Sequence, residues 1–274
     1  MSAIGHHRAR SQCRPQNMQS RYLYRLVIYA MDLTMQCPAI ENHCKSKIFL
    51  AERSIMNIYA INASPRKKGN TATILQHVLD GAVEASKGSV QTELIHLYSY
   101  QYTGCKSCFA CKLKNGKSYG KCAVKDDITP ILEKLSQADA IVFGSPIYFG
   151  GVSGMLRCFE ERLLFPYLTY TEGHASIAPK KLRTGFVYTM NVSAEIMEEW
   201  KYPSRLNMME GYVGHIFGSS PEVLYVNNTV QFPDYAKYVC TMFSGEEKAK
   251  YREEHFPESC QKARDMGASF VTAS

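Results

Sequence analysis

The chain has 274 residues, of which 45% are hydrophobic and 21% charged, as expected for a globular protein with a substantial core. Its formal net charge of +7 is concentrated in residues 1–55, which hold eight Lys and Arg against three Asp and Glu. The remaining residues hold 24 against 22, so their charge is nearly balanced. This distribution argues against a nucleic-acid-binding surface on the main part of the chain.

Residues 1–55 differ from the rest of the chain. Their most apolar run, YLYRLVIYAM, is interrupted by Arg25 and is too short to be a signal peptide or to span a bilayer. We expect a non-native or disordered extension, with Met56 as the natural start, because the codons for Glu-Arg-Ser just before it can form a ribosome-binding sequence. A genuine disordered or partner-binding extension is the alternative. Ten cysteines in a chain without an export signal argue against a disulfide-stabilised scaffold. We expect a cytoplasmic protein without membrane or nucleic-acid partners.

From Met56 onward, strand patterns alternate with helix patterns. Strands are predicted at 56–62, 89–98, 138–146, 184–191 and 222–230. Helices are predicted at 71–86, 128–137, 154–165, 194–216 and 246–270.

The ends of several predicted helices carry their own signals. Asp126 or Asp127 is expected to cap the second helix, whose first turn tolerates Pro130, and Ser153 is expected to cap the third. Pro257 is expected to break the last one. These elements form one domain over 56–274 that ends in a helical extension.

Alternating strands and helices predict an α/β fold: a three-layer, doubly wound domain around a parallel five-stranded sheet. In the strand order 2-1-3-4-5, the first and third strands are neighbours whose connections diverge. Ligands bind outside the carboxyl ends of such strands. The two loops that leave these strands, after 56–62 and after 138–146, are therefore the candidate ligand site.

The loop NASPRKKGNTAT leaves the first strand and opens the first helix. It offers the side chains of Ser64, Asn70 and Thr71, three adjacent cations at 66–68, and the free N–H groups of a helix start. These groups suit a dianionic phosphate. The spacing is neither a dinucleotide-binding motif nor a P-loop. The alternative is a basic turn without a ligand.

The loop GSPIYFGGVSGM leaves the third strand. Its aromatic residues and paired glycines would make a rigid wall that a flat ring can approach, although the same residues could simply pack at a strand end. A phosphate site beside an aromatic wall, at the point where the strand order reverses, is what FMN requires.

Four cysteines follow the second strand in GCKSCFACKLKNGKSYGKC. Cys105, Cys108 and Cys111 lie on a tight C-x2-C-x2-C, and Cys122 follows after a gap of ten residues. Such thiolates can ligate an iron–sulfur cluster, with the lysines of the segment offsetting its charge. Zinc and an empty loop of reactive thiols are the alternatives.

Together the phosphate loop, the aromatic loop and the cysteine loop resemble the flavodoxin-like NADPH-dependent FMN reductase superfamily, and within it the iron–sulfur flavoprotein group. The likeness covers about Met56 to Asn191. It implies that one set of residues binds FMN and that the four cysteines ligate a [4Fe–4S] cluster, although the gap before Cys122 is longer than is usual in that group. The implied FMN-binding residues are Ser64, Arg66, Asn70, Thr71, Ala72, Pro146, Ile147, Tyr148, Phe149, Gly150, Met190 and Asn191.

The resemblance also implies a function. We expect an oxidoreductase that takes electrons from NAD(P)H or a ferredoxin-like donor and passes them to a quinone, a second electron carrier or an oxygen species. The flavin would carry the chemistry, so no protein side chain is assigned as catalytic. A homodimer or homotetramer is expected. The alternative is a non-enzymatic, flavodoxin-like electron carrier.

Overall fold

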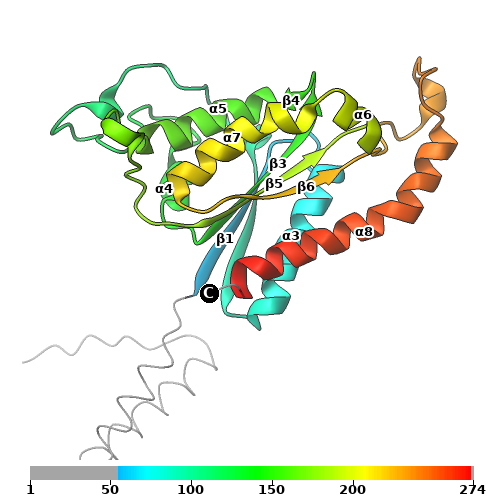
Figure 1. Ribbon diagram of the computed structural model, residues 1–274, viewed down its shortest axis with the longest axis horizontal. Helices are drawn as coiled ribbons and strands as arrows, with labels where there is room; N and C mark the ends of the chain where they lie inside the picture. The colour runs from blue at the N-terminus through cyan, green and yellow to red at the C-terminus, as the bar shows by residue number, and fades with distance from the viewer. Residues whose placement is uncertain (1–54, 273–274) are drawn as a thin grey trace, which may run out of the picture. The chain divides into compact units, whose positions relative to one another are not determined.

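The computed structural model describes residues 55–272 (Figure 1). The extension expected over 1–55 lies outside the described residues, apart from Ile55. In the part of the chain that is described, no helix is both long and apolar enough to cross a membrane.

A parallel sheet forms the centre of the domain (Figure 1). Its order, β2-β1-β3-β5-β6, is the predicted order 2-1-3-4-5, so the doubly wound α/β fold is confirmed. The five parallel strands are β1 (Met56–Asn62), β2 (Val90–His96), β3 (Ala140–Tyr148), β5 (Arg183–Thr189) and β6 (Glu222–Val226).

A sixth strand was not predicted. The two residues of β4 (Gly151–Val152) pair antiparallel with the end of β3. The chain can reverse so tightly because Phe149 and Gly150 both adopt positive φ angles, of 52° and 76°. The aromatic loop is therefore a short hairpin at the carboxyl end of β3.

Helices cover both faces of the sheet and enclose two apolar cores (Figure 1). One face carries α4 (Thr129–Leu135), α5 (Gly154–Leu164), α6 (Ala194–Glu199) and α7 (Tyr202–Phe217). The opposite face carries α3 (Asn70–Ser86) and α8 (Gly245–Thr272).

Two of the helix predictions were wrong about where a helix is interrupted. The helix expected over 194–216 is two helices, α6 and α7, separated by Lys201 at a φ of 55°. Pro203 lies at the start of α7, where its missing N–H costs nothing. In contrast, α8 continues through Pro257 without a break. Long-range packing of α8 against α3 outweighs the single hydrogen bond that this proline removes.

Of the two predicted helix caps, one is confirmed and the other was wrong. Ser153 does cap α5, because its Oγ accepts a hydrogen bond from the Leu156 N–H at 3.3 Å. Pro130 lies in the first turn of α4 as predicted. No side chain caps α4, so the cap expected from Asp126 or Asp127 was wrong. Both carboxylates have other partners: Asp126 binds Arg162, and Asp127 accepts from the Gln101 N–H at 2.9 Å.

The helices α3 and α8 cross unusually closely. A Cβ added at Gly81 would overlap the backbone of Arg264, and one added at Gly267 would overlap the carbonyl oxygen of Val78. Arg264 also reaches across the crossing to Asp80, at 3.6 Å. The two glycines thus allow α8 to lie directly on α3, and this fixes where the amino-terminal half of α8 lies.

Candidate functional site

The predicted phosphate loop connects β1 to α3 in a tight, locally hydrogen-bonded turn. The Ser64 N–H donates to Asn62 Oδ1 at 3.0 Å, and the Arg66 N–H donates to Ser64 Oγ at 3.2 Å. Gly69 precedes α3 in an extended conformation, and no side chain caps the helix there. The first N–H groups of α3 are thus available to an anion, which fits a phosphate.

The side chains of this loop are only partly directed at that position. Arg66 Nη1 donates to the carbonyl oxygen of Gln231 at 2.5 Å, and Asn70 Nδ2 donates to that of Val230 at 2.9 Å. Thr71 Oγ1 lies 2.7 Å from Thr189 Oγ1. Ala72 is buried. Among the predicted phosphate-binding residues, Asn70, Thr71 and Ala72 would therefore contribute mainly backbone N–H groups.

The aromatic loop lies beside the phosphate loop, because β1 and β3 are paired neighbours in the sheet. Pro146 and Ile147 are partly buried, whereas Tyr148 is exposed. The side chain of Phe149 is fully exposed although its backbone is in the left-handed region. A bulky residue held in that conformation is strained, and such strain is concentrated at functional sites.

The third predicted flavin-binding loop follows β5, which is paired with β3 so that Thr189 lies opposite Pro146. Met190 is buried here. The carbonyl oxygen of Asn191 accepts a hydrogen bond from Lys248 Nζ at 2.6 Å. Asn191 Oδ1 is buried without a hydrogen-bond partner in the described part of the chain, so it is free to accept one from a ligand.

Two residues that sequence reasoning missed fasten these loops from α8. Lys248 binds Asn191 and also Asn228 Oδ1, and burial lowers the pKa of its amine to about 8. Arg252 Nη1 donates to Asn70 Oδ1 at 2.6 Å. The two cations are four residues apart, so they share one helix face. That spacing was visible in the sequence, but nothing local indicated what it would meet.

The structure brings the four cysteines of the predicted cluster site to one pocket. Cys111 is buried, Cys108 is exposed, and the other two lie between these extremes. The loop achieves this by curling through Ser107 and Phe109, whose φ angles are 51° and 54°. Two left-handed residues within three positions are costly, and they turn successive cysteines toward the same space.

Two cations, the buried Arg162 and the partly buried Lys112, hold the cysteine loop in place. Arg162 donates to Cys122 Sγ at 2.9 Å and to Asp126 Oδ2 at 2.7 Å, and it is 1% exposed. Burial by itself would raise the pKa of Asp126, but the hydrogen bonds from Arg162 outweigh it and hold that pKa below the usual value. Lys112 Nζ donates to backbone carbonyl oxygens that follow α5, including that of Pro166 at 3.2 Å. The loop is thereby anchored to α5 and to the segment that follows it.

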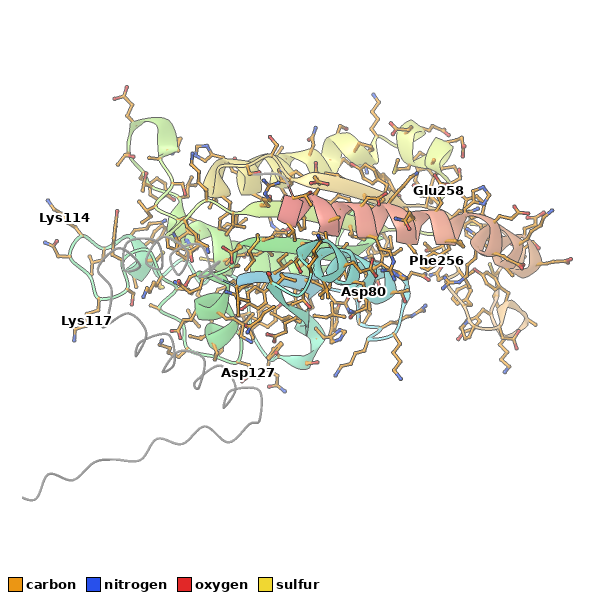
Figure 2. The ribbon with its side chains drawn as sticks, turned by 90° about the horizontal axis from the view of Figure 1, so that it is seen from below. Asp80, Lys114, Lys117, Asp127, Phe256 and Glu258 are labelled. Atoms are coloured by element: carbon orange, nitrogen blue, oxygen red, sulfur yellow. The ribbon has the colours of Figure 1, made fainter. Side chains whose placement is uncertain are left out.

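Within residues 55–272, no group of three His, Cys, Asp or Glu side chains is arranged to hold a metal ion. A cubane cluster takes one thiolate at each of four separate irons, so its cysteines surround a larger space. The lysines contribute less than expected, because Lys114 and Lys117 project outward from the loop (Figure 2) and only Lys106 lines the pocket.

The sequence was compared with known families and proteins. Residues 56–175 match the NADPH-dependent FMN reductase family. This segment is therefore similar to that family. An iron–sulfur flavoprotein of Archaeoglobus fulgidus is 44% identical over 107 residues, which are 39% of this chain and 48% of that protein. The chain spans about half the length of the curated relatives that it matches.

Two solved structures share the fold of this chain. An NAD(P)H:quinone oxidoreductase from Methanothermobacter marburgensis superimposes with a TM-score of 0.57 at 15% identity, covering 81% of this chain and all of that one. An FMN-dependent NADH-azoreductase from Bacillus anthracis, solved with FMN, gives a TM-score of 0.57 at 11% identity and covers 79% of this chain and 100% of its own. The flavodoxin-like fold is therefore shown.

Proposed function

We propose that the chain is an FMN-dependent oxidoreductase that moves electrons from NAD(P)H or a ferredoxin-like donor to a quinone, an electron carrier or an oxygen species. The observation that carries the proposal is the meeting of three loops at one edge of the sheet, where β1, β3 and β5 end side by side. An uncapped helix start, an exposed aromatic hairpin and an orphaned amide oxygen lie there together. The family match and the FMN-bound structural neighbour support the same cofactor.

Bound FMN would supply the redox chemistry by accepting hydride and passing electrons on singly or in pairs. The protein's part is to bind and orient it. Ser64, Arg66 and the first N–H groups of α3 would hold the phosphate. The hairpin at 146–150 would line the ring, with Met190 and Asn191 on its third side.

We further propose that Cys105, Cys108, Cys111 and Cys122 ligate a [4Fe–4S] cluster, as the names of several relatives suggest. Such a cluster transfers single electrons. The shared pocket and the strained curl of the loop support this assignment. A homodimer or homotetramer is part of the proposal, because the fully exposed Phe149 beside the flavin position would then be covered.

Anaerobic purification followed by a visible spectrum, flavin release and iron and sulfide analysis tests both assignments. The expected result is one FMN and four irons per chain, with steady NAD(P)H oxidation in the presence of ferricyanide. Flavin without iron would leave the fold argument intact and remove the cluster. Flavin without turnover would favour the electron carrier, and protein that takes up no added FMN would overturn the proposal.

A further inference from the structure

A second pocket lies between α5 and α7, beside the cysteine pocket. Its volume is about 390 Å³, which is within the size range of small-molecule sites, roughly 300–1,000 Å³. It shares Cys105, Glu161 and Phe165 with the cysteine pocket. The apolar part of its wall includes Leu164, Phe165, Leu168, Met209 and Ile216.

One wall residue does not match this apolar lining. Glu160 is 0% exposed, and both of its carboxyl oxygens lack a hydrogen-bond partner among residues 55–272. An unsatisfied carboxyl group in a protein interior costs free energy, and a native structure that retains one usually has a use for it. Glu160 is nevertheless one of the residues that line the pocket.

The charged groups around Glu160 determine what that molecule can be. From α5, Arg157 and Glu161 pair with each other at 3.5 Å, so they nearly neutralise one another at the rim. The Tyr188 hydroxyl of β5 and Glu210 of α7 lie on the sheet side, and neither supplies a positive charge. Burial raises the pKa of Glu160 to about 8, so the group is a neutral acid at neutral pH.

We propose that this pocket binds a small, uncharged aromatic compound with a carbonyl oxygen, a quinone being the model case, and that Glu160 is its hydrogen-bond donor. The apolar wall accommodates the ring, and the protonated carboxyl donates to the carbonyl oxygen. Neither an anion nor a cation would find an unpaired opposite charge there. Binding of such a compound does not depend on the proposed function, but its role as an electron acceptor does. In this pocket it would lie next to Cys105, one of the proposed cluster ligands.

Duroquinone is a suitable probe, because its fully substituted ring has no free position for addition of a cysteine thiol. Its binding to the full, flavin-loaded chain is measured by calorimetry under anaerobic, non-reducing conditions. Tetramethylbenzoate, an anion of similar size, serves as the matched ligand and is expected not to bind. Duroquinone that fails to bind the wild-type chain, including because a second copy covers the pocket, would overturn the proposal.

Variants then locate the site. Replacing Glu160 with Leu removes the donor and is expected to weaken binding at least tenfold, the effect of losing one hydrogen bond to a buried polar group. Glu160→Gln keeps a donor and should retain affinity within about threefold. Leu removes an unsatisfied carboxyl group from the core and Gln keeps the size of Glu, so both variants should fold, as their melting temperatures will show.

An occluding variant gives an independent check. Met209 lines the pocket from α7 and is only partly buried, so Met209→Trp should fill the space and abolish binding without disturbing the core. Tyr148→Ala alters the flavin wall instead. Loss of binding in that variant, with normal binding in Glu160→Leu, would place duroquinone at the flavin and refute the inference. Failure of the proposed function can be told apart from failure of this inference. In the first case flavin or turnover is absent although duroquinone still binds, and in the second duroquinone does not bind at this pocket.

Discussion

Arg252 donates a hydrogen bond from Nη1 to Asn70 Oδ1 at 2.6 Å, although 182 residues separate the two in the chain. Arg252 is held in position by the ring of Phe256, 4.0 Å from its guanidinium carbon. Asn70 is the first residue of α3 and part of the proposed phosphate site. Helix α8, at the end of the described chain, therefore helps to shape the phosphate loop that leads into α3.

Arg252→Gln should weaken FMN binding without unfolding the protein. The substitution removes one of the two hydrogen bonds that hold the Asn70 side chain and so loosens the phosphate loop. Loss of a hydrogen bond to a charged group costs about 1.5–3 kcal/mol. Because Arg252 acts on FMN only through Asn70, we expect only part of this free energy to be lost from FMN binding, which corresponds to about a five- to twentyfold rise in Kd. Quenching of FMN fluorescence by the apoprotein measures it. Arg264→Gln, on the same helix but away from the loop, is the control, and equal effects of both variants would contradict the argument.

Gly267→Ala should be strongly destabilising. The added methyl group would overlap the Val78 carbonyl and force α8 away from α3. We expect a loss of about 2–4 kcal/mol in the free energy of unfolding, measured in urea. Gly211→Ala is the matched control, because Gly211 lies in α7 with nothing within 4 Å of its added Cβ. That variant should gain about 0.5–1 kcal/mol from helix propensity, and a loss there would undermine the comparison.

Stability should depend on pH through Glu160. Burial raises its pKa to about 8 from the ordinary 4.5. The folded chain thus keeps a proton that the unfolded chain releases, so the contribution of Glu160 to stability is greatest below about pH 4.5 and falls as pH rises toward 8. Glu160→Gln removes this loss, which is on the order of 4 kcal/mol. Urea titrations at both ends of the window test it. Glu133→Gln, an exposed glutamate on α4, should change nothing, and parallel curves for wild type and Glu160→Gln would refute the prediction.

Cys122→Ala should lower the iron content after anaerobic reconstitution with iron and sulfide. Cys122 lines the cysteine pocket and accepts a hydrogen bond from Arg162, so its loss removes the fourth proposed ligand. We expect less than half of the wild-type iron per chain, by colorimetric assay. Cys158→Ala, in α5 and outside the proposed ligand set, should keep the full amount. Equal iron in the two variants would exclude Cys122 as a ligand.

The sequence by itself determined the fold class and the order of the strands, because periodicity and turn residues are local signals. The strand MNIYAIN coincides with β1, and the phosphate and aromatic loops lie where the switch in strand order requires. The four cysteines were also identifiable from spacing alone. Local pattern failed where a distant partner decides the outcome, as with Asp126, which binds Arg162 instead of capping α4.

Only the tertiary structure decided what the last third of the chain contributes. Lys248 and Arg252 look like two surface cations of a terminal helix, and Pro257 looks like the point where that helix breaks. The glycine crossing with α3 keeps α8 continuous and brings both cations to the flavin loops. Glu160 likewise resembles an ordinary helix-surface acid until α7 closes over it. Burial and long-range contact depend on the whole chain, and no window of neighbouring residues encodes them.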